Sequence, residues 1–153
     1  MADPLGIAAS VIALVQLAAA TIQYVKDVKD GSSDRTRLRD ELRSTTCVLE
    51  MLRDRMEDSQ ISGEVTIKPE LLATLSATDG PLNLLQKLLQ DIITTLKPQT
   101  RLGRLAQPYT WPFTKKEVVE TLDALERLKS NFNLIIQGDI VYDPPLSSPD
   151  LMK

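Results

Sequence analysis

The fold of this chain is decided by residues 4–25, which read PLGIAASVIALVQLAAATIQYV and contain no charged side chain. At about 1.5 Å of rise per residue, a helix of this length just crosses a bilayer core of about 30 Å. Such a helix suits two settings: the centre of a helical bundle, buried nearly all round, or a lipid bilayer. The sequence favours the buried setting at rest and leaves insertion open for another state. A secretory signal is not expected, because an acid, Asp3, precedes the apolar run and no base does.

A helical wheel divides this segment into two faces. One face and its apolar neighbours form the predicted membrane-insertion set: Leu5, Ile7, Val11, Ile12, Leu14, Val15, Leu17, Ile22 and Val25. The opposite face, called the small face below, is uncharged and is predicted to line a pore or meet a partner: Ala9, Ala13, Gln16, Ala20 and Gln23.

The composition predicts one helical domain without catalytic machinery. Of 153 residues 42% are apolar but only 4% aromatic, so Leu, Ile, Val and Ala must build the core, which favours helices. The net charge of −3 argues against a nucleic-acid partner. Because the chain has no His, Cys47 lacks a catalytic base and a zinc co-ligand. Phosphate-binding glycine loops are also missing. We therefore expect no enzyme activity, cofactor, metal or small-molecule substrate.

Apolar periodicity predicts the other helices. Residues 34–58 carry a heptad-like seam, formed by Leu38, Leu42, Thr45, Leu49, Leu52 and Met56 and widened by Val48. A loop is predicted over residues 59–68. The next element begins at Pro69 and ends at Pro98, and Asp79-Gly80-Pro81 makes it either one kinked helix or two short ones.

The last helix is predicted over residues 115–137, with Gly138 as its stop. Its core face consists of Val118, Leu122, Leu125, Leu128, Phe132 and Ile135 or Ile136. Thr114 and Glu117 have the spacing of a capping box, and Trp111 is expected to cover the end of the bundle.

These elements predict an all-α, antiparallel four-helix bundle with a hydrophobic N-terminal helix and a kinked third helix. Residues 1–138 form the bundle. Residues 139–153, rich in Pro and Ser, are interpreted as a linker toward a downstream module.

Two stretches resemble a known family. Residues 1–14, MADPLGIAASVIAL, resemble the start of the N-terminal helical domain of fungal STAND (NLR-like) receptors. The motif Trp111-Pro112-Phe113, followed by TKKE, is similar to the block that opens the last helix of that domain. Gly80-Pro81-Leu82 also resembles its middle helix. The matches stand in the family's order and cover nearly the whole chain.

The resemblance implies a HeLo-like domain that signals regulated cell death in innate immunity and heterokaryon incompatibility. A NACHT or NB-ARC module would follow the linker. Self-association on activation would carry the domain from the cytoplasm to the plasma membrane, where the first helix would permeabilise the lipid. Residues 4–25 contain no acid, and Asp3 stands before them, so nonspecific permeabilisation is expected rather than an acidic ion-selective ring. The alternative is a soluble homotypic interaction bundle that signals to a separate effector.

Overall fold

The computed structural model of the chain describes residues 4–28, 32–62, 69–97 and 111–141. These ranges form the helices α1 (Pro4–Lys26), α2 (Ser32–Ser62), α3 (Pro69–Ser76), α4 (Pro81–Leu96) and α6 (Lys115–Val141). No strand occurs in this part of the chain. The all-α prediction is therefore confirmed.

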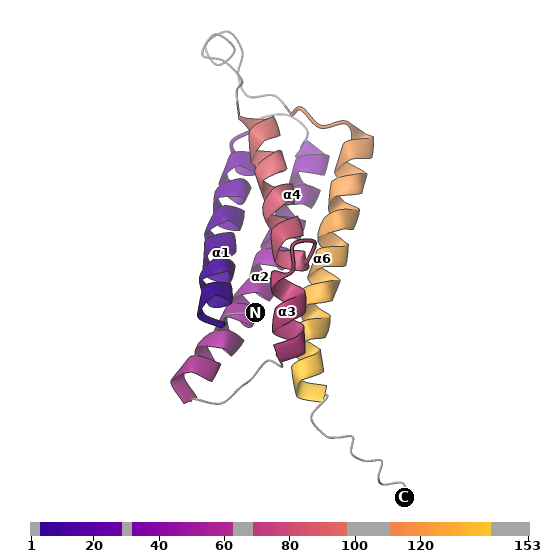
Figure 1. Ribbon diagram of the computed structural model, residues 1–153. Helices are drawn as coiled ribbons and strands as arrows, with labels where there is room; N and C mark the ends of the chain where they lie inside the picture. Colours follow the sequence, from indigo (N-terminus) through magenta and orange to yellow (C-terminus); the bar gives the residue numbers. More distant parts are fainter. Residues whose placement is uncertain (1–3, 29–31, 63–68, 98–110, 142–153) are drawn as a thin grey trace, which may run out of the picture.

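The long helices α1, α2, α4 and α6 lie side by side around one core (Figure 1). α2 packs extensively against both α1 and α6, and α4 packs against α1. α4 and α6 pack against each other much less extensively. The short helix α3 contacts α4 and α1. The seam between α4 and α6 is therefore the least closed of the seams between the long helices.

The core is built from the predicted aliphatic rows. The seam of α2 is buried along its whole length, from Leu38 to Met56. On α6 the predicted core face is buried except for Leu122, which is half-buried. Phe132 is the largest of the fully buried side chains described. Both core predictions are confirmed.

Two predicted helix ends are wrong. α2 continues to Ser62, four residues beyond Asp58 and into the predicted loop. α6 passes through Gly138 and ends at Val141. A glycine inside a helix costs only about 1 kcal/mol relative to alanine, so Gly138 alone does not end a helix that is otherwise well packed. Residues 29–31, 63–68, 98–110 and 142–153, which include the rest of the predicted loop and most of the predicted linker, lie outside the described residues.

The third predicted helix is bent, as α3 and α4 are separated by a turn at residues 77–80. Gly80 precedes α4 in an extended conformation and donates its N–H to the carbonyl of Ala77 at 2.8 Å. The side-chain amide of Asn83 donates to the same carbonyl at 3.0 Å. A Cβ atom on Gly80 would lie 2.4 Å from the carbonyl oxygen of Thr74. The turn therefore requires glycine for steric reasons.

Gly80→Ala is expected to lower the free energy of unfolding by about 2 kcal/mol. The new methyl group would meet backbone oxygens, which cannot move aside as a flexible side chain can. Urea denaturation followed by circular dichroism measures the change. Gly6→Ala, in an exposed turn of α1, is the control and is expected to be neutral or to stabilise by up to about 1 kcal/mol. Equal stability of Gly80→Ala and the parent chain would contradict this steric account.

Candidate functional site

α1 presents an uncharged face to solvent. Every residue of the small face is exposed. Beside it, Leu5 and Ile12 are 66% and 38% exposed, which is unusual for large apolar side chains. The first charged residue of the helix is Lys26, in its last turn. An exposed strip without charge therefore runs along almost the whole helix.

The rest of the predicted insertion set is divided between core and boundary. Ile7, Val11, Leu14 and Val25 are buried in the core. Half-buried positions at the edge of the core are occupied by Val15, Leu17 and Ile22.

The sequence pattern missed one buried polar residue of α1. Thr21 is fully buried, and its hydroxyl donates to the carbonyl of Leu17 at 2.8 Å. This hydrogen bond within the helix satisfies the hydroxyl, so Thr21 sits among apolar neighbours at little cost.

The expectation that α1 is buried nearly all round at rest is wrong. α2, α3 and α4 cover one side of the helix and leave the small face open. Exposing alanine or glutamine to water costs little free energy, because alanine has a small apolar surface and glutamine is polar. The small face is therefore compatible with an outer position of α1 in the fold.

α1 is the only helix within the described ranges that is long and apolar enough to cross a bilayer. The candidate span is Leu5–Lys26, and 33% of its most apolar window is buried inside the fold. Core helices of soluble proteins pass the same test of length and composition. The distinguishing feature of α1 is therefore the open small face rather than its hydropathy.

α1 and α6 are held to the fold in different ways. α1 contributes apolar side chains to the core, and a polar neighbour, the Lys97 ammonium, lies 6.0 Å from the centre of the Tyr24 ring. α6 also buries an apolar row in the core, and in addition Lys129 ties it to α2. The Lys129 ammonium lies 2.8 Å from a carboxylate oxygen of Glu41 and donates to the Ser44 hydroxyl at 3.0 Å.

The environment of Lys129 favours its charged form. Burial lowers the pKa of Lys129, but the hydrogen bond and charge of Glu41 outweigh burial, and Glu126 on the same helix adds to the effect. The pKa of Lys129 is therefore raised above its ordinary 10.5. A raised pKa in the folded state means that the ion pair stabilises the fold fully below the unfolded pKa. That contribution is lost as the pH rises through the folded pKa.

Lys129→Met is expected to cost about 2 kcal/mol of unfolding free energy at pH 7, because it leaves the largely buried Glu41 carboxylate without its partner. The difference from the parent chain should begin to shrink above pH 10.5, the ordinary pKa of lysine in the unfolded chain, and should vanish only as the pH rises through the higher pKa of folded Lys129. Urea denaturation between pH 7 and pH 11 measures this. Lys116→Met, at an exposed position, should change little at any pH. A Lys129→Met deficit that stays constant up to pH 11 would contradict the ion-pair account.

The Trp-Pro-Phe motif forms the entry to α6. Trp111 and Phe113 are half-buried against the core, with ring centres 5.1 Å apart and planes at 58°, whereas Pro112 is exposed. The predicted capping box is confirmed. The Glu117 N–H donates to the Thr114 hydroxyl at 3.1 Å, and the Thr114 N–H donates to the Glu117 carboxylate at 2.9 Å. The motif thus fixes where α6 starts.

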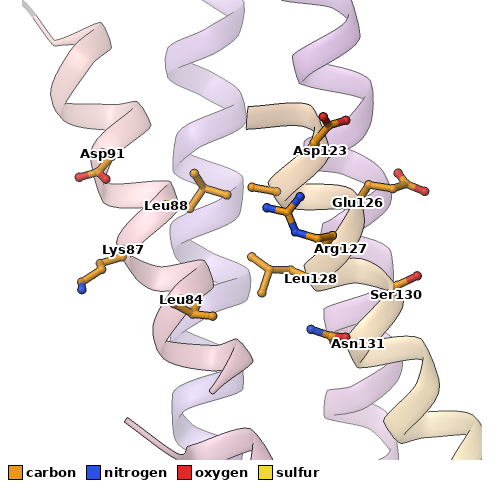
Figure 2. A pocket seen from close by; sticks show the side chains of 11 residues that line it. Leu84, Lys87, Leu88, Asp91, Asp123, Glu126, Arg127, Leu128, Ser130 and Asn131 are labelled. Carbon is orange, nitrogen blue, oxygen red and sulfur yellow. The ribbon is translucent and has the colours of Figure 1, made fainter. Parts of the chain in front are cut away.

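A groove of about 680 Å³ lies along the open seam between α4 and α6 (Figure 2). Apolar side chains from both helices line it: Leu84, Leu88, Ala124 and Leu128. Charged residues stand along it: Lys87, Asp91, Asp123, Glu126 and Arg127. The sequence prediction missed this surface. One feature of the sequence indicates this surface. Leu84 and Leu88 form an apolar i, i+4 pair that lies beside the buried row of Leu85 and Leu89, so α4 has more apolar residues than one buried row needs.

The described residues contain no group of three or more His, Cys, Asp or Glu side chains placed to hold a metal ion. Cys47 is a free, exposed thiol on α2. No family model, curated protein or solved structure matches the chain. The family resemblance therefore rests on residues 1–14, the Gly-Pro-Leu turn and the Trp-Pro-Phe motif.

Proposed function

We propose that this chain is the N-terminal effector domain of a fungal STAND (NLR-like) immune receptor of the HeLo-like type. In this proposal the helices form an antiparallel four-helix bundle, and residues 139–153 link it to a NACHT or NB-ARC module. On activation the domain self-associates, moves from the cytoplasm to the plasma membrane and permeabilises it through α1, which triggers regulated cell death. Its partners are copies of itself and membrane lipids, and it performs no enzymatic step.

The observation that carries the proposal is the exposed, uncharged small face on a helix long enough to cross a bilayer. A charged side chain at the centre of a bilayer costs several kcal/mol, and α1 has none before Lys26. Its apolar row is as compatible with lipid as with the core. The small face then turns toward neighbouring copies or toward water in a pore, where Gln16 and Gln23 find hydrogen-bond partners.

The mode of attachment supports release of α1 from the fold. Apolar contacts of α1 with α2 and α4 can be exchanged for contacts with lipid chains, whereas the Lys129–Glu41 ion pair keeps α6 attached to α2. A single released helix inserts weakly because it must leave the core. Several helices held together in one assembly insert cooperatively, since each insertion raises the effective concentration of the next helix at the membrane.

A specific observation also favours the second candidate, a soluble homotypic interaction bundle. Val11 and Val25 are fully buried, and α1 has more contact with α2 than with any other helix. In this reading α1 stays in the core permanently, and the small face binds another copy or an adaptor.

Dye release from liposomes of anionic and of neutral lipid separates the two candidates. The full chain is tested alone and fused to an oligomerising coiled coil, with circular dichroism confirming the helical fold. Release that rises steeply on oligomerisation is the expected result. A folded, oligomerised chain that releases no dye from either lipid would overturn the membrane proposal in favour of the interaction bundle. Deletion of α1 is unsuitable as a control, because its buried row is part of the core.

A further inference from the structure

The charges along the α4–α6 groove form two levels. Asp91 on α4 stands level with Asp123 on α6, and Lys87 stands level with Arg127 further along the groove (Figure 2). On each helix the acid and the base are four residues apart, which is about 6 Å along the axis. All of these side chains belong to exposed residues, and none of them forms an ion pair within the described part of the chain. The groove thus carries an acidic level and a basic level, both without ion-pair partners in the described part of the chain. A fifth charged residue, Glu126, lies between the two levels (Figure 2), and its carboxylate is already paired with the Lys129 ammonium at 3.3 Å.

Such a pattern is self-complementary in one orientation only. A two-fold axis in the plane of the groove and perpendicular to the helices reverses the order of the levels. With this axis, α4 of one copy faces α4 of the second copy in the reverse direction, and α6 faces α6 in the same way. The acidic level of each copy therefore meets the basic level of the other. A two-fold axis parallel to the helices keeps the order, and Asp91 would then face Asp123 of the second copy. Like charges directly opposed are strongly disfavoured at an interface.

We propose that a second copy of this chain docks in the α4–α6 groove about the two-fold axis perpendicular to the helices. Lys87 of each copy pairs with Asp91 of the other, and Asp123 of each copy pairs with Arg127 of the other. The interface is isologous, as in most homodimers, because each copy presents the same surface. The inference rests on the self-association in the proposed function but not on its membrane step.

Apolar side chains supply the contact area between these pairs. Leu84 is 45% exposed in the groove, and Val119, one turn before Asp123 on α6, is 47% exposed. Both would be covered by the second copy. The exposed charge pairs fix the orientation more than they add affinity, so the dimer is expected to weaken as salt is raised. Docking here involves α4 and α6 and leaves the small face of α1 free.

Charge reversal with complementation tests the pairing. The double variant Asp91→Lys/Asp123→Lys makes both levels basic, and Lys87→Glu/Arg127→Glu makes both levels acidic, while Glu126 stays paired with Lys129 in each. Each double variant alone is expected to dimerise at least about 10-fold more weakly than the parent chain, because like charges then face each other. An equimolar mixture of the two is expected to form a heterodimer at least as tight as the parent dimer. Sedimentation velocity over a range of concentrations measures all of these.

The matched control for Asp91→Lys/Asp123→Lys is Glu57→Lys/Asp58→Lys, which makes the same change in net charge at exposed positions of α2 outside the groove. It should dimerise as the parent does. A parent chain that stays monomeric at every concentration, or a mixture that fails to restore association, would overturn the inference. The liposome assay keeps the two proposals apart. If the chain releases dye but its association does not depend on the groove charges, the groove dimer is refuted and the membrane step is not. If the chain forms the charge-dependent dimer but releases no dye, the membrane step is refuted and the groove dimer is not.

Discussion

Gln16→Glu is expected to abolish most of the dye release from liposomes while leaving the fold intact. Gln16 lies near the middle of α1 on the exposed small face, so an added charge meets water in the folded chain. A helix that enters the bilayer before neighbouring copies or pore water reach its small face carries the same charge near the bilayer centre, where an acidic side chain costs about 2.5–3.5 kcal/mol. The fraction of inserted helix should therefore fall roughly 100-fold per copy. The initial rate of dye release at matched protein concentration measures the effect.

The control is Gln90→Glu, an identical chemical change at an exposed position of α4. It alters net charge by the same amount and should release dye at the parent rate. Circular dichroism and urea denaturation should place both variants within about 0.5 kcal/mol of the parent chain, as expected for exposed substitutions. If Gln16→Glu folds and releases dye as fast as Gln90→Glu, the small face does not meet lipid during insertion.

The core rows could be predicted because burial has a period that the sequence displays. In α2 the seam residues recur every three or four positions, and charged residues fill most of the positions between them. Only one face of such a helix can be buried, so the prediction leaves no choice. The same reasoning placed Leu125 and Phe132 in the core of α6 and identified the capping box before it.

The exposure of α1 could not be predicted in this way. With no charged residue between Pro4 and Val25, the sequence does not mark which positions must face water. Alanine and glutamine do not mark whether a helix face is buried or exposed as clearly as charged residues do. The choice between a central and an outer position therefore depends on how many neighbouring helices reach α1, which is a property of the tertiary structure.

The α4–α6 groove and the Lys129–Glu41 link were missed for a related reason. Each depends on residues of two helices that are far apart in sequence, and local spacing does not show which helices become neighbours. Lys129 and Glu41 each look like ordinary surface charges in their own helices. Only the packing of α2 against α6 brings the ammonium within 2.8 Å of the carboxylate.

Phe132→Ala is expected to be the most destabilising of the substitutions considered, with a loss of about 3–5 kcal/mol of unfolding free energy. The side chain is 0% exposed and is the largest of the fully buried side chains described. Its removal leaves a cavity in the core that rigid helices fill only in part. Since domains of this size are stabilised by about 5–15 kcal/mol, the loss is a large share of the total. Urea denaturation measures it.

Leu134→Ala is the matched control, two residues along the same helix at a position that is 65% exposed. It should change stability by no more than about 0.5 kcal/mol. The pair also bears on the release of α1. If α1 must leave the core before it enters lipid, Phe132→Ala should release dye from liposomes faster than the parent chain, at temperatures where this variant is still folded. Leu134→Ala should release dye at the parent rate. Equal rates for Phe132→Ala and the parent would show that departure from the core does not limit the membrane step.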